Sequence, residues 1–456
     1  MSEFVTKVRF RIPVFELKRA VFCASLLALV LAACGSSVDD GSTASSGKIE
    51  LSSWWTSGGE ADALNAALAV HKAKYPNVTV VNLADSTATK ARQQLELKVL
   101  ENNLPDTFQT NIGADLLRWV KFNGIDTSES KIEPIQATVS SSGFYDSLVA
   151  KASLDGNFYA VPMNIHRINS LFYSKKVFDD HKIGYPTDDM TLDEFNSLCM
   201  QIKAAKVTPL ALGNHEPWVL QELVFEDILP GIAGAAYYEA FWQGLKSPGD
   251  SVIDQTIQEA LWLRCGPAKA SSCNDGFFNG DADTMEWTDA LDLVQSNQVA
   301  MVAMGDWAKG YFESNGWQAD VNFGVVQFPG TKKVFIYTAD TFSLTAKSGP
   351  SHTLAAQLLQ TFASVESQGI FNHFKGSIPA LDVDLSQYPD PGLFDSMQQQ
   401  TFLTWKNAEQ GLAMSGLLLS DALTELGVTL MNATVADPKV SIQTYLDKNY
   451  PTLRKL

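Results

Sequence analysis

Two adjacent tryptophans at the end of a short strand are the residues of this sequence best suited to hold a ligand. Ile49 and Leu51 alternate as in a strand, Trp54 and Trp55 follow, and a Gly-Gly turn leads to Glu60 at the start of a helix. Open α/β folds place ligands where strand ends meet helix starts. Indole faces beside backbone N–H groups and a carboxylate suit a sugar ring, which is apolar across its C–H face and hydroxylated around its rim.

The same residues have a simpler interpretation. Two tryptophans after a strand can fill a hydrophobic core. Ser57 and Glu60 also fit a capping box, with Ser57 as the N-cap and Glu60 three positions later. The residues alone do not separate a ligand platform from ordinary packing.

The elements around the tryptophans predict a parallel sheet. Strand and helix alternate at the spacing of right-handed βαβ units. Gln109, near the end of the third strand, would then lie beside Trp54 and Trp55 at one edge of the sheet. The predicted elements are strand 49–52, helix 57–75, strand 77–83, helix 87–100 and strand 105–111.

A second lobe is predicted where the pattern changes. β-rich runs on either side of Pro162 indicate a crossover, for which Asn164 and His166 are interpreted as hinge or packing residues. A helical block begins at a capping box, Thr191 to Glu194, and continues to about residue 295. Strands return after residue 298, so a sheet domain is expected to be interrupted by another domain, with several segments crossing between two lobes.

The N-terminus is interpreted as an export signal. Five basic residues precede the apolar run 20–33, which is shorter than the roughly 20 residues that span a bilayer. The run ends in Leu31-Ala-Ala-Cys34, which resembles a bacterial lipobox and implies cleavage before Cys34 and acylation of its sulfur. The domain prediction is therefore a signal peptide over 1–33 and a lipidated, flexible tether over 34–47. A short anchor that stays attached is the alternative.

Composition and charge exclude some classes of protein. A 456-residue chain that is 45% hydrophobic is long enough for two or three folded domains. Removing residues 1–33 takes away five basic and two acidic side chains, so the formal charge falls from −17 to −20. A surface this acidic repels phosphate backbones, so no nucleic acid partner is expected.

Cysteine and histidine usage predicts a disulfide and no metal site. Cys265 and Cys273, in a segment rich in Gly, Pro, Ser and Asn, would close a small loop in an oxidising compartment, although two separate thiols are the alternative. Cys199, within a predicted helix, is expected to be a buried apolar residue. The six histidines lack metal-ligand spacing, and there is no phosphate loop or Gly-x-Ser-x-Gly motif, so neither cofactor nor metal is predicted.

Several spaced motifs together resemble bacterial extracellular solute-binding proteins (family 1) of carbohydrate ABC transporters, and among them the glucose-type monosaccharide-binding lipoproteins. The resemblance covers nearly all of the chain after residue 34. The motifs are Trp54-Trp-Thr-Ser-Gly-Gly-Glu60, Val161-Pro-Met-Asn-Ile-His-Arg-Ile-Asn169, Met304-Gly-Asp-Trp307, Phe328-Pro-Gly-Thr331 with Asp340-Thr-Phe342, and Lys375-Gly-Ser-Ile-Pro379.

The resemblance implies an α/β, two-lobed periplasmic-binding-protein fold, in which each lobe is a mostly parallel sheet flanked by helices and hinge strands join the lobes. It implies an N-lobe of 48–160 plus about 298–340 and a C-lobe of 161–297 plus about 341–456. It also implies stacking on Trp54 and Trp55 and a bidentate contact from Asp306. The remaining implied ligand contacts are Glu60, Gln109, Lys333, His373 and, from the second lobe, Trp262 or Trp287.

Each of these residues also has a structural interpretation. Asp306 fits the N-cap of a helix starting at Trp307. Lys333, next to another lysine, fits a solvated strand residue, and His373 fits a surface position on a helix. Trp262 and Trp287 fit a hydrophobic core equally well.

The resemblance implies a monomeric receptor that faces the periplasm or the cell exterior. It would bind a monosaccharide such as glucose, galactose or mannose, close on it, and deliver it to the membrane permease of an ABC transporter without catalysing a reaction. Acylated Cys34 would attach it to the membrane. A lipid-anchored glycoside hydrolase is the alternative, because it also uses tryptophans and carboxylates in a cleft. A structural or adhesive lipoprotein would not need aromatic residues at strand-to-helix junctions.

Overall fold

The computed structural model describes most of the chain beyond residue 45. The predicted signal peptide, Cys34, Cys273 and Lys333 lie outside the described residues. Among the residues that are described, no helix is long and apolar enough to cross a membrane. The described ranges are 46–83, 88–120, 130–216, 218–243, 245–246, 250–267, 276–332, 334–390, 392–408 and 410–413.

The first sheet is mixed and begins with the predicted βαβ units. β1 pairs in parallel with β2 and β3, and β13, from far along the chain, adds antiparallel to β3 and β6. Ile49 and Leu51 are fully buried on one face of β1, as their alternation predicts. The strands, in spatial order, are β2 (Val78–Asn82), β1 (Gly47–Ser52), β3 (Thr107–Asn111), β13 (Asp340–Leu344) and β6 (Ala160–Pro162).

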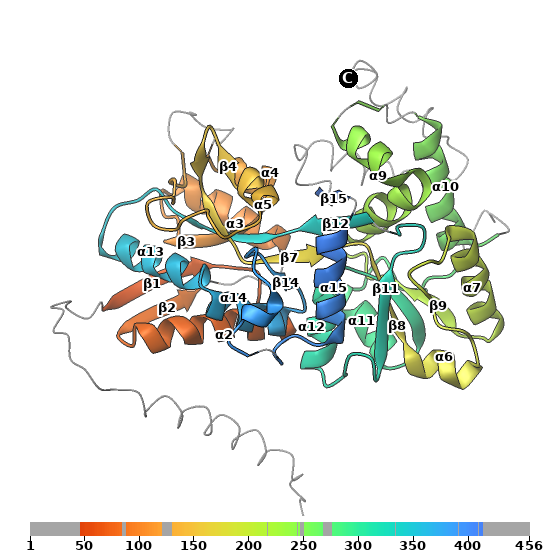
Figure 1. Cartoon of the computed structure of the whole chain (residues 1–456). Coiled ribbons are helices and arrows are strands. Elements are labelled where there is room, and N and C mark those ends of the chain that lie inside the picture. The colour runs from red at the N-terminus through yellow and green to blue at the C-terminus, as the bar shows by residue number, and fades with distance from the viewer. Residues whose placement is uncertain are drawn as a thin grey trace, which may run out of the picture. The chain divides into compact units, whose positions relative to one another are not determined.

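Helices from two distant parts of the chain cover this first sheet and complete the first hydrophobic core (Figure 1). α2 and α3 connect the parallel strands, and α13 and α14 pack against β1 and α2. Leu358, Phe362 and Phe371 are fully buried in this core. The helices are α2 (Gly58–Lys74), α3 (Ala88–Leu100), α4 (Ala114–Leu117), α5 (Asp146–Lys151), α13 (Pro350–Phe362) and α14 (Val365–Lys375), with the small pair β4 (Ser153–Leu154) and β5 (Asn157–Phe158).

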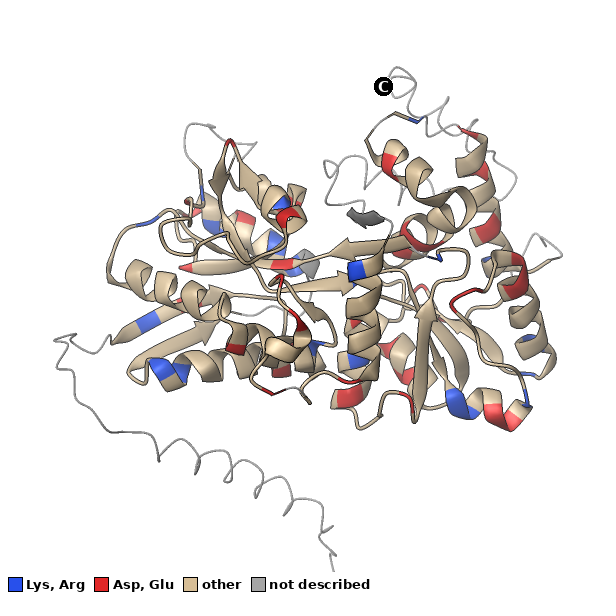
Figure 2. Ribbon diagram, in the orientation of Figure 1, with Lys and Arg blue, Asp and Glu red and all other residues tan. Residues whose placement is uncertain are grey.

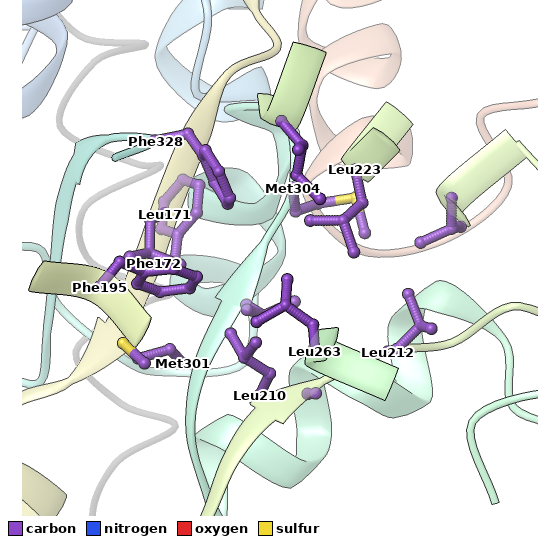
Figure 3. Close-up of a cluster of buried hydrophobic side chains, with 14 of the residues drawn as sticks. Leu171, Phe172, Phe195, Leu210, Leu212, Leu223, Leu263, Met301, Met304 and Phe328 are labelled. Atoms are coloured by element: carbon purple, nitrogen blue, oxygen red, sulfur yellow. The ribbon is translucent and has the colours of Figure 1, made fainter. Parts of the chain in front are cut away.

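A second sheet carries a separate core. β8 pairs antiparallel with β10 and β11, and β10 pairs in parallel with β9. Figure 3 shows Leu171 and Phe172 of β8 beside Phe195 and Met301, in a cluster built from strands and helices. The strands, in spatial order, are β11 (Phe323–Gln327), β8 (Ser170–Ser174), β10 (Val299–Ala303) and β9 (Thr208–Ala211).

The helices of the second core include two local irregularities, a kink at Gly234 within α9 and the π-helix η2. α7 begins with the predicted capping box, in which Thr191 and Glu194 exchange hydrogen bonds. After α8 the chain widens into a π-helix, η2, which carries Glu222, Glu226 and Asp227. The helices are α6 (Lys175–His181), α7 (Leu192–Ala204), α8 (Trp218–Gln221), η2 (Glu222–Ile228), α9 (Leu229–Trp242), α10 (Ser251–Cys265), α11 (Trp287–Gln295) and α12 (Trp307–Ser314).

Two paired segments run between the cores. β7 (Asn164–Arg167) follows β6 after one residue, and β13 follows β12 (Val334–Thr338) after one residue. β7 and β12 pair antiparallel, with Thr338 opposite His166 (Figure 1). Alternate residues of β12 belong to different cores, because Phe335 and Tyr337 lie in the first and Val334 and Ile336 in the second. This third sheet is completed by β14 (Ile378–Pro379) and β15 (Gln410–Ala413). The remaining described elements are η3 (Leu385–Gln387) and α15 (Ser396–Asn407), and α15 packs on β14.

The packing confirms two lobes joined by strands but differs from the predicted boundaries. β10 and β11, which were assigned to the N-lobe within 298–340, pair with β8 and belong to the second core. α13 and α14, which were assigned to the C-lobe, pack in the first. The reason is that β12 and β13 carry the chain back to the first sheet, and the sequence contains no local signal for that return.

Candidate functional site

A histidine on the β7 strand is the centre of a buried polar network. His166 is 2% exposed, and its Nδ1 contacts Asp306 Oδ1. On its other side, Nε2 lies 3.2 Å from Asp340 Oδ2 and 2.8 Å from Asn164 Nδ2. Pairing of β7 with β12 brings Asp340 to this point, because it follows the residue opposite His166 by two positions.

Asp340 links His166 to the first sheet. Its Oδ2 accepts a hydrogen bond from Asn164 Nδ2 at 2.9 Å, and its Oδ1 accepts one from Gln109 Nε2 at 3.0 Å. Gln109 Oε1 in turn accepts hydrogen bonds from Ser53 Oγ at 2.7 Å and from the Trp54 backbone N–H at 3.3 Å. The predicted neighbourhood of Gln109 and Trp54 is therefore present. We call Gln109, Asn164, His166, Asp306 and Asp340 the polar network.

Opposite charges hold the centre of the network together. Burial lowers the pKa of His166, but the Asp306 carboxylate and hydrogen bonds to Asp306 and Asp340 outweigh burial and leave that pKa above its usual value. Burial raises the pKa of Asp340, but the hydrogen bond from His166 and the charge of Lys375 outweigh it and lower the pKa to about 2. An imidazolium between two carboxylates is the arrangement that these shifts describe.

Asp306 occupies an N-cap position without capping the helix. It precedes α12, but its side chain accepts no hydrogen bond from the first turn. Its Oδ2 instead accepts from the Arg167 backbone N–H at 2.9 Å, while Oδ1 faces His166. Asp306 thus connects the start of α12 to β7. Its carboxylate does not cap the helix, so the N-cap interpretation of this side chain is wrong.

The two tryptophans that open the site differ in their surroundings. Trp55 is 1% exposed and packs against Phe342 and Phe371, with ring centroids 5.7 and 5.0 Å away. Trp54 is only partly buried, and the guanidinium carbon of Arg92 lies 5.4 Å from its ring centroid. Trp55 is therefore a core residue in this structure, whereas Trp54 keeps part of its surface accessible.

Glu60 forms an ion pair with Lys375 instead of a capping box. Ser57 occupies the N-cap of α2, but its side chain makes no cap hydrogen bond. The Lys375 side chain is 2% exposed, contacts Glu60, and lies 5.2 Å from the ring centroid of Trp55. Lys375 begins the Lys375-Gly-Ser-Ile-Pro379 motif, but nothing in the sequence indicates that its ammonium group lies beside Glu60 and Trp55.

Three side chains that are predicted to contact the ligand pack against other residues of the protein. Trp262 packs on Phe277 with centroids 4.5 Å apart, and Trp287 meets Tyr311 at 5.7 Å. His373 Nδ1 lies 2.6 Å from the Leu393 carbonyl oxygen. Contact of these three side chains with a ligand stays a prediction.

A different aromatic pair of the second core borders the network. Trp307, which follows Asp306, meets His166 edge-on at 5.2 Å between centroids and Trp218 at 6.0 Å. Both tryptophans are partly buried. The sequence signal for Trp307 was its place in the Met-Gly-Asp-Trp motif, whereas Trp218 had none.

The cysteine predictions have unequal outcomes. Cys199 is a buried free thiol, as predicted, and burial raises its pKa. Cys265 is buried and not free, but Cys273 lies outside the described residues, so their pairing stays a prediction. Within the described ranges, no group of three His, Cys, Asp or Glu side chains could hold a metal ion.

The chemistry of the network is that of hydrogen-bonded recognition. Carboxylate, amide and imidazolium groups supply both acceptors and donors at one place. His166 Nε2 faces Asp340 and Asn164, where a nucleophilic catalytic arrangement would place a hydroxyl or thiol. Two cores joined by paired strands, with a polar network at the junction, are the arrangement expected of the class of two-lobed solute-binding proteins.

Comparison with known proteins supports this class. The family described as bacterial extracellular solute-binding protein matches residues 66–384. The chain is 31% identical over 335 residues to an uncharacterized ABC transporter extracellular-binding protein of Pyrococcus horikoshii, covering 73% of this chain and 71% of that one. It is 29% identical to a probable sugar-binding periplasmic protein of Mesorhizobium japonicum, covering 81% and 84%.

The fold is similar to that of a solved chitin oligosaccharide binding protein. The TM-score is 0.73 at 16% identity, with 90% of this chain and 98% of the other covered. The chain belongs to the bacterial extracellular solute-binding protein family.

Proposed function

We propose that this protein is the exported receptor of a carbohydrate ABC transporter, and that it binds one glucose-like monosaccharide at the polar network between its lobes. The observation that carries the proposal is the network itself. It links side chains of the first sheet, the connecting strands and the start of α12 by hydrogen bonds. The related protein from Mesorhizobium japonicum, named as sugar-binding, supports the ligand class.

A sugar matches the chemistry of these side chains. Its hydroxyl groups can take over hydrogen bonds that the carboxylates and amides now make with one another. Trp54, half-buried next to Gln109, offers one apolar face, and Trp307 offers another beside His166. Pyranose C–H groups pack well on such faces.

The compactness of the network favours a single ring. Successive members, from Gln109 through Asp340 to His166, lie within 3.2 Å of each other. A long oligosaccharide would need contacts distributed over several subsites. The solved chitin oligosaccharide binding protein shares the fold at low identity, so its ligand length does not transfer to this chain.

Binding is proposed to close the two lobes through β7 and β12. Hinge closure around a ligand is the usual motion of this class of proteins. Because alternate residues of β12 belong to different cores, bending of the strand changes the relative position of both. The closed protein would then engage the membrane permease as a monomer, without chemical turnover of the sugar.

Attachment to the membrane is proposed to depend on Cys34. The lipobox-like Leu31-Ala-Ala-Cys34 supports acylation, and residues 35–47 would tether the folded lobes. The expected result of mass spectrometry on protein from membranes is an acylated N-terminal cysteine. The Cys34→Ala variant should leave the membrane fraction, and its retention there would contradict lipid anchoring.

Calorimetry on the purified protein tests the ligand. Glucose, galactose and mannose should be compared with maltose and chitobiose, and the products analysed after long incubation. The expected result is saturable binding of one monosaccharide per chain with no product. Binding of oligosaccharides alone would contradict the monosaccharide proposal, and release of a product would favour the glycoside hydrolase alternative.

A further inference from the structure

The π-helix η2 places three acidic side chains in the interior of the second core. Glu222 is 2% exposed, and Glu226 and Asp227 are fully buried. We call these three residues the η2 carboxylates. A π-helix is rare and is often found at functional sites, because its wider turn changes the direction in which side chains point.

Two of the η2 carboxylates lack side-chain hydrogen-bond partners among the described residues. Both carboxyl oxygens of Asp227 are buried without a hydrogen bond, and the Gly305 backbone N–H is the donor that acts on Glu222. Glu226 differs, since the Tyr238 hydroxyl donates to it. Burying a carboxylate that no side chain pairs with costs free energy. Glu222 and Asp227 therefore hold acceptor oxygens that no side chain of the described residues uses.

The η2 carboxylates lie beside the polar network. Burial and the charge of Asp306 raise the pKa of Glu222. Burial lowers the pKa of Arg167, and the charges of Asp306 and Asp227 both raise it against that effect. The preceding helix, α8, brings Trp218 against Trp307, which in turn meets His166. The acceptors of Glu222 and Asp227 therefore belong to the surroundings of the proposed sugar site.

Acidic groups outnumber basic groups in this region, and Figure 2 shows Asp and Glu residues on several of the surrounding helices. Lys375 is paired with Glu60. Exposed Asp188 also faces Arg167. Burial, together with repulsion among the η2 carboxylates, raises the pKa of Glu222 and of Asp227 well above the usual range. The other buried ionisable groups of this region are the acids Glu222, Glu226, Asp227, Asp306 and Asp340 and the bases His166, Arg167 and Lys309, of which Lys309 is paired with Glu313 and Asp395.

We infer that the ligand of this site is a sugar that carries an ammonium group, and that Glu222 and Asp227 receive that group. This rests on the proposed sugar-receptor function and narrows it to amino sugars. An ammonium has three N–H donors and one positive charge, which fit carboxyl oxygens that no described side chain uses, in a region where acidic groups outnumber basic groups. In the free protein, protons on these two carboxyls take the place of the missing cation.

Matched pairs of sugars provide the test. Glucosamine, 3-amino-3-deoxyglucose and 6-amino-6-deoxyglucose are each compared with glucose by calorimetry at about pH 6, where a sugar amine is protonated. At least one amino sugar should bind about tenfold or more tightly than glucose, and N-acetylglucosamine should lose this advantage. Binding of the amino sugar should release protons, which is measured in buffers of different ionisation enthalpy.

Charge-neutral variants locate the ammonium. Glu222→Gln and Asp227→Asn keep side-chain size, and each should reduce the preference for the amino sugar over glucose. Asp254→Asn, an exposed carboxylate on neighbouring α10, is the control and should keep the full preference. If either η2 variant does not fold, proton release by the wild-type protein still tests the inference. Binding of an amino sugar should release protons, and binding of glucose should release none.

The sugar-receptor function and the preference for amino sugars are contradicted by different results. If glucose binds and no amino sugar binds more tightly, the ammonium inference is wrong while the receptor function stands. If no sugar of either kind binds, both are wrong. An amino-sugar preference that persists in both η2 variants also overturns the assignment to Glu222 and Asp227.

Discussion

Replacement of Asp340 by asparagine tests the electrostatic design of the polar network. In the folded protein the pKa of this carboxyl is lowered from 3.8 to about 2. One pKa unit corresponds to about 1.4 kcal/mol, so the charged form contributes about 2 kcal/mol to the free energy of unfolding at pH 7. Asp340→Asn should lose roughly this amount, because the amide cannot pair with the His166 imidazolium.

The pH dependence gives the sign of the effect. Because the folded pKa lies below the unfolded one, the stabilisation is present above pH 3.8 and is lost as the pH falls toward 2. By about pH 3, roughly half of it should remain. The stability difference between wild type and Asp340→Asn should therefore shrink over that interval.

Denaturant titrations followed by tryptophan fluorescence, at pH values from 7 to about 3, measure both quantities. Asp62→Asn, an exposed carboxylate on α2, is the control and should change stability by less than about 0.5 kcal/mol. Equal stabilities of Asp340→Asn and Asp62→Asn at pH 7 would refute the reasoning. A wild-type to Asp340→Asn difference that stays constant down to pH 3 would refute it as well.

Three further predictions concern the same region. The pKa of His166 is raised in the folded protein, so its contribution to stability is complete below pH 6.5 and is lost as the pH rises through the folded pKa. His166→Gln should therefore flatten the decline in unfolding free energy between about pH 6 and 8, and equal slopes in wild type and variant would contradict this. Lys375→Met leaves Glu60 without its cation and should cost about 2 kcal/mol or more, partly restored in the double variant with Glu60→Gln; additive losses in denaturation would show that the pair is not coupled. Trp54→Ala should weaken sugar binding by more than about 1 kcal/mol in calorimetry, whereas Trp262→Ala should leave the affinity unchanged; the reverse order would move the site to the second core.

Local patterns were sufficient to predict the first three strands and the two helices between them. Helices and strands from β1 to β3 lie within about two residues of their predicted ranges. Apolar alternation in β1 and the stop at Pro76 are short-range signals, and short-range signals determine element type. The neighbourhood of Gln109 and Trp54 followed from the βαβ spacing alone.

Contacts between distant segments could not be predicted in the same way. Asp340 meets Asn164 across 176 residues and Gln109 across 231. The crossover pattern predicts a hinge or packing role for His166, and this residue does lie on β7 between the two cores. The sequence does not reveal that both of its ring nitrogens face carboxylates. Only the pairing of β7 with β12 creates that arrangement.

The tryptophans show a related limit of local patterns. Trp55, Trp262 and Trp287 occur in strand-end or helical contexts that are compatible with either a core or a binding site. Periodicity shows which residues share a face of an element, but not what that face packs against. Trp307, one residue after a predicted contact, illustrates how small the difference in sequence can be.

The division of β12 between two cores fixes its length. Insertion of a single residue near its start would turn every later side chain to the opposite face of the strand. The aromatic rings of Phe335 and Tyr337 would then enter a space shaped for Ile336, while that isoleucine would leave a void in the place of a ring. Homologous chains are therefore expected to vary freely in the loops that precede this strand, and to keep an unchanged number of residues from Val334 to Thr338.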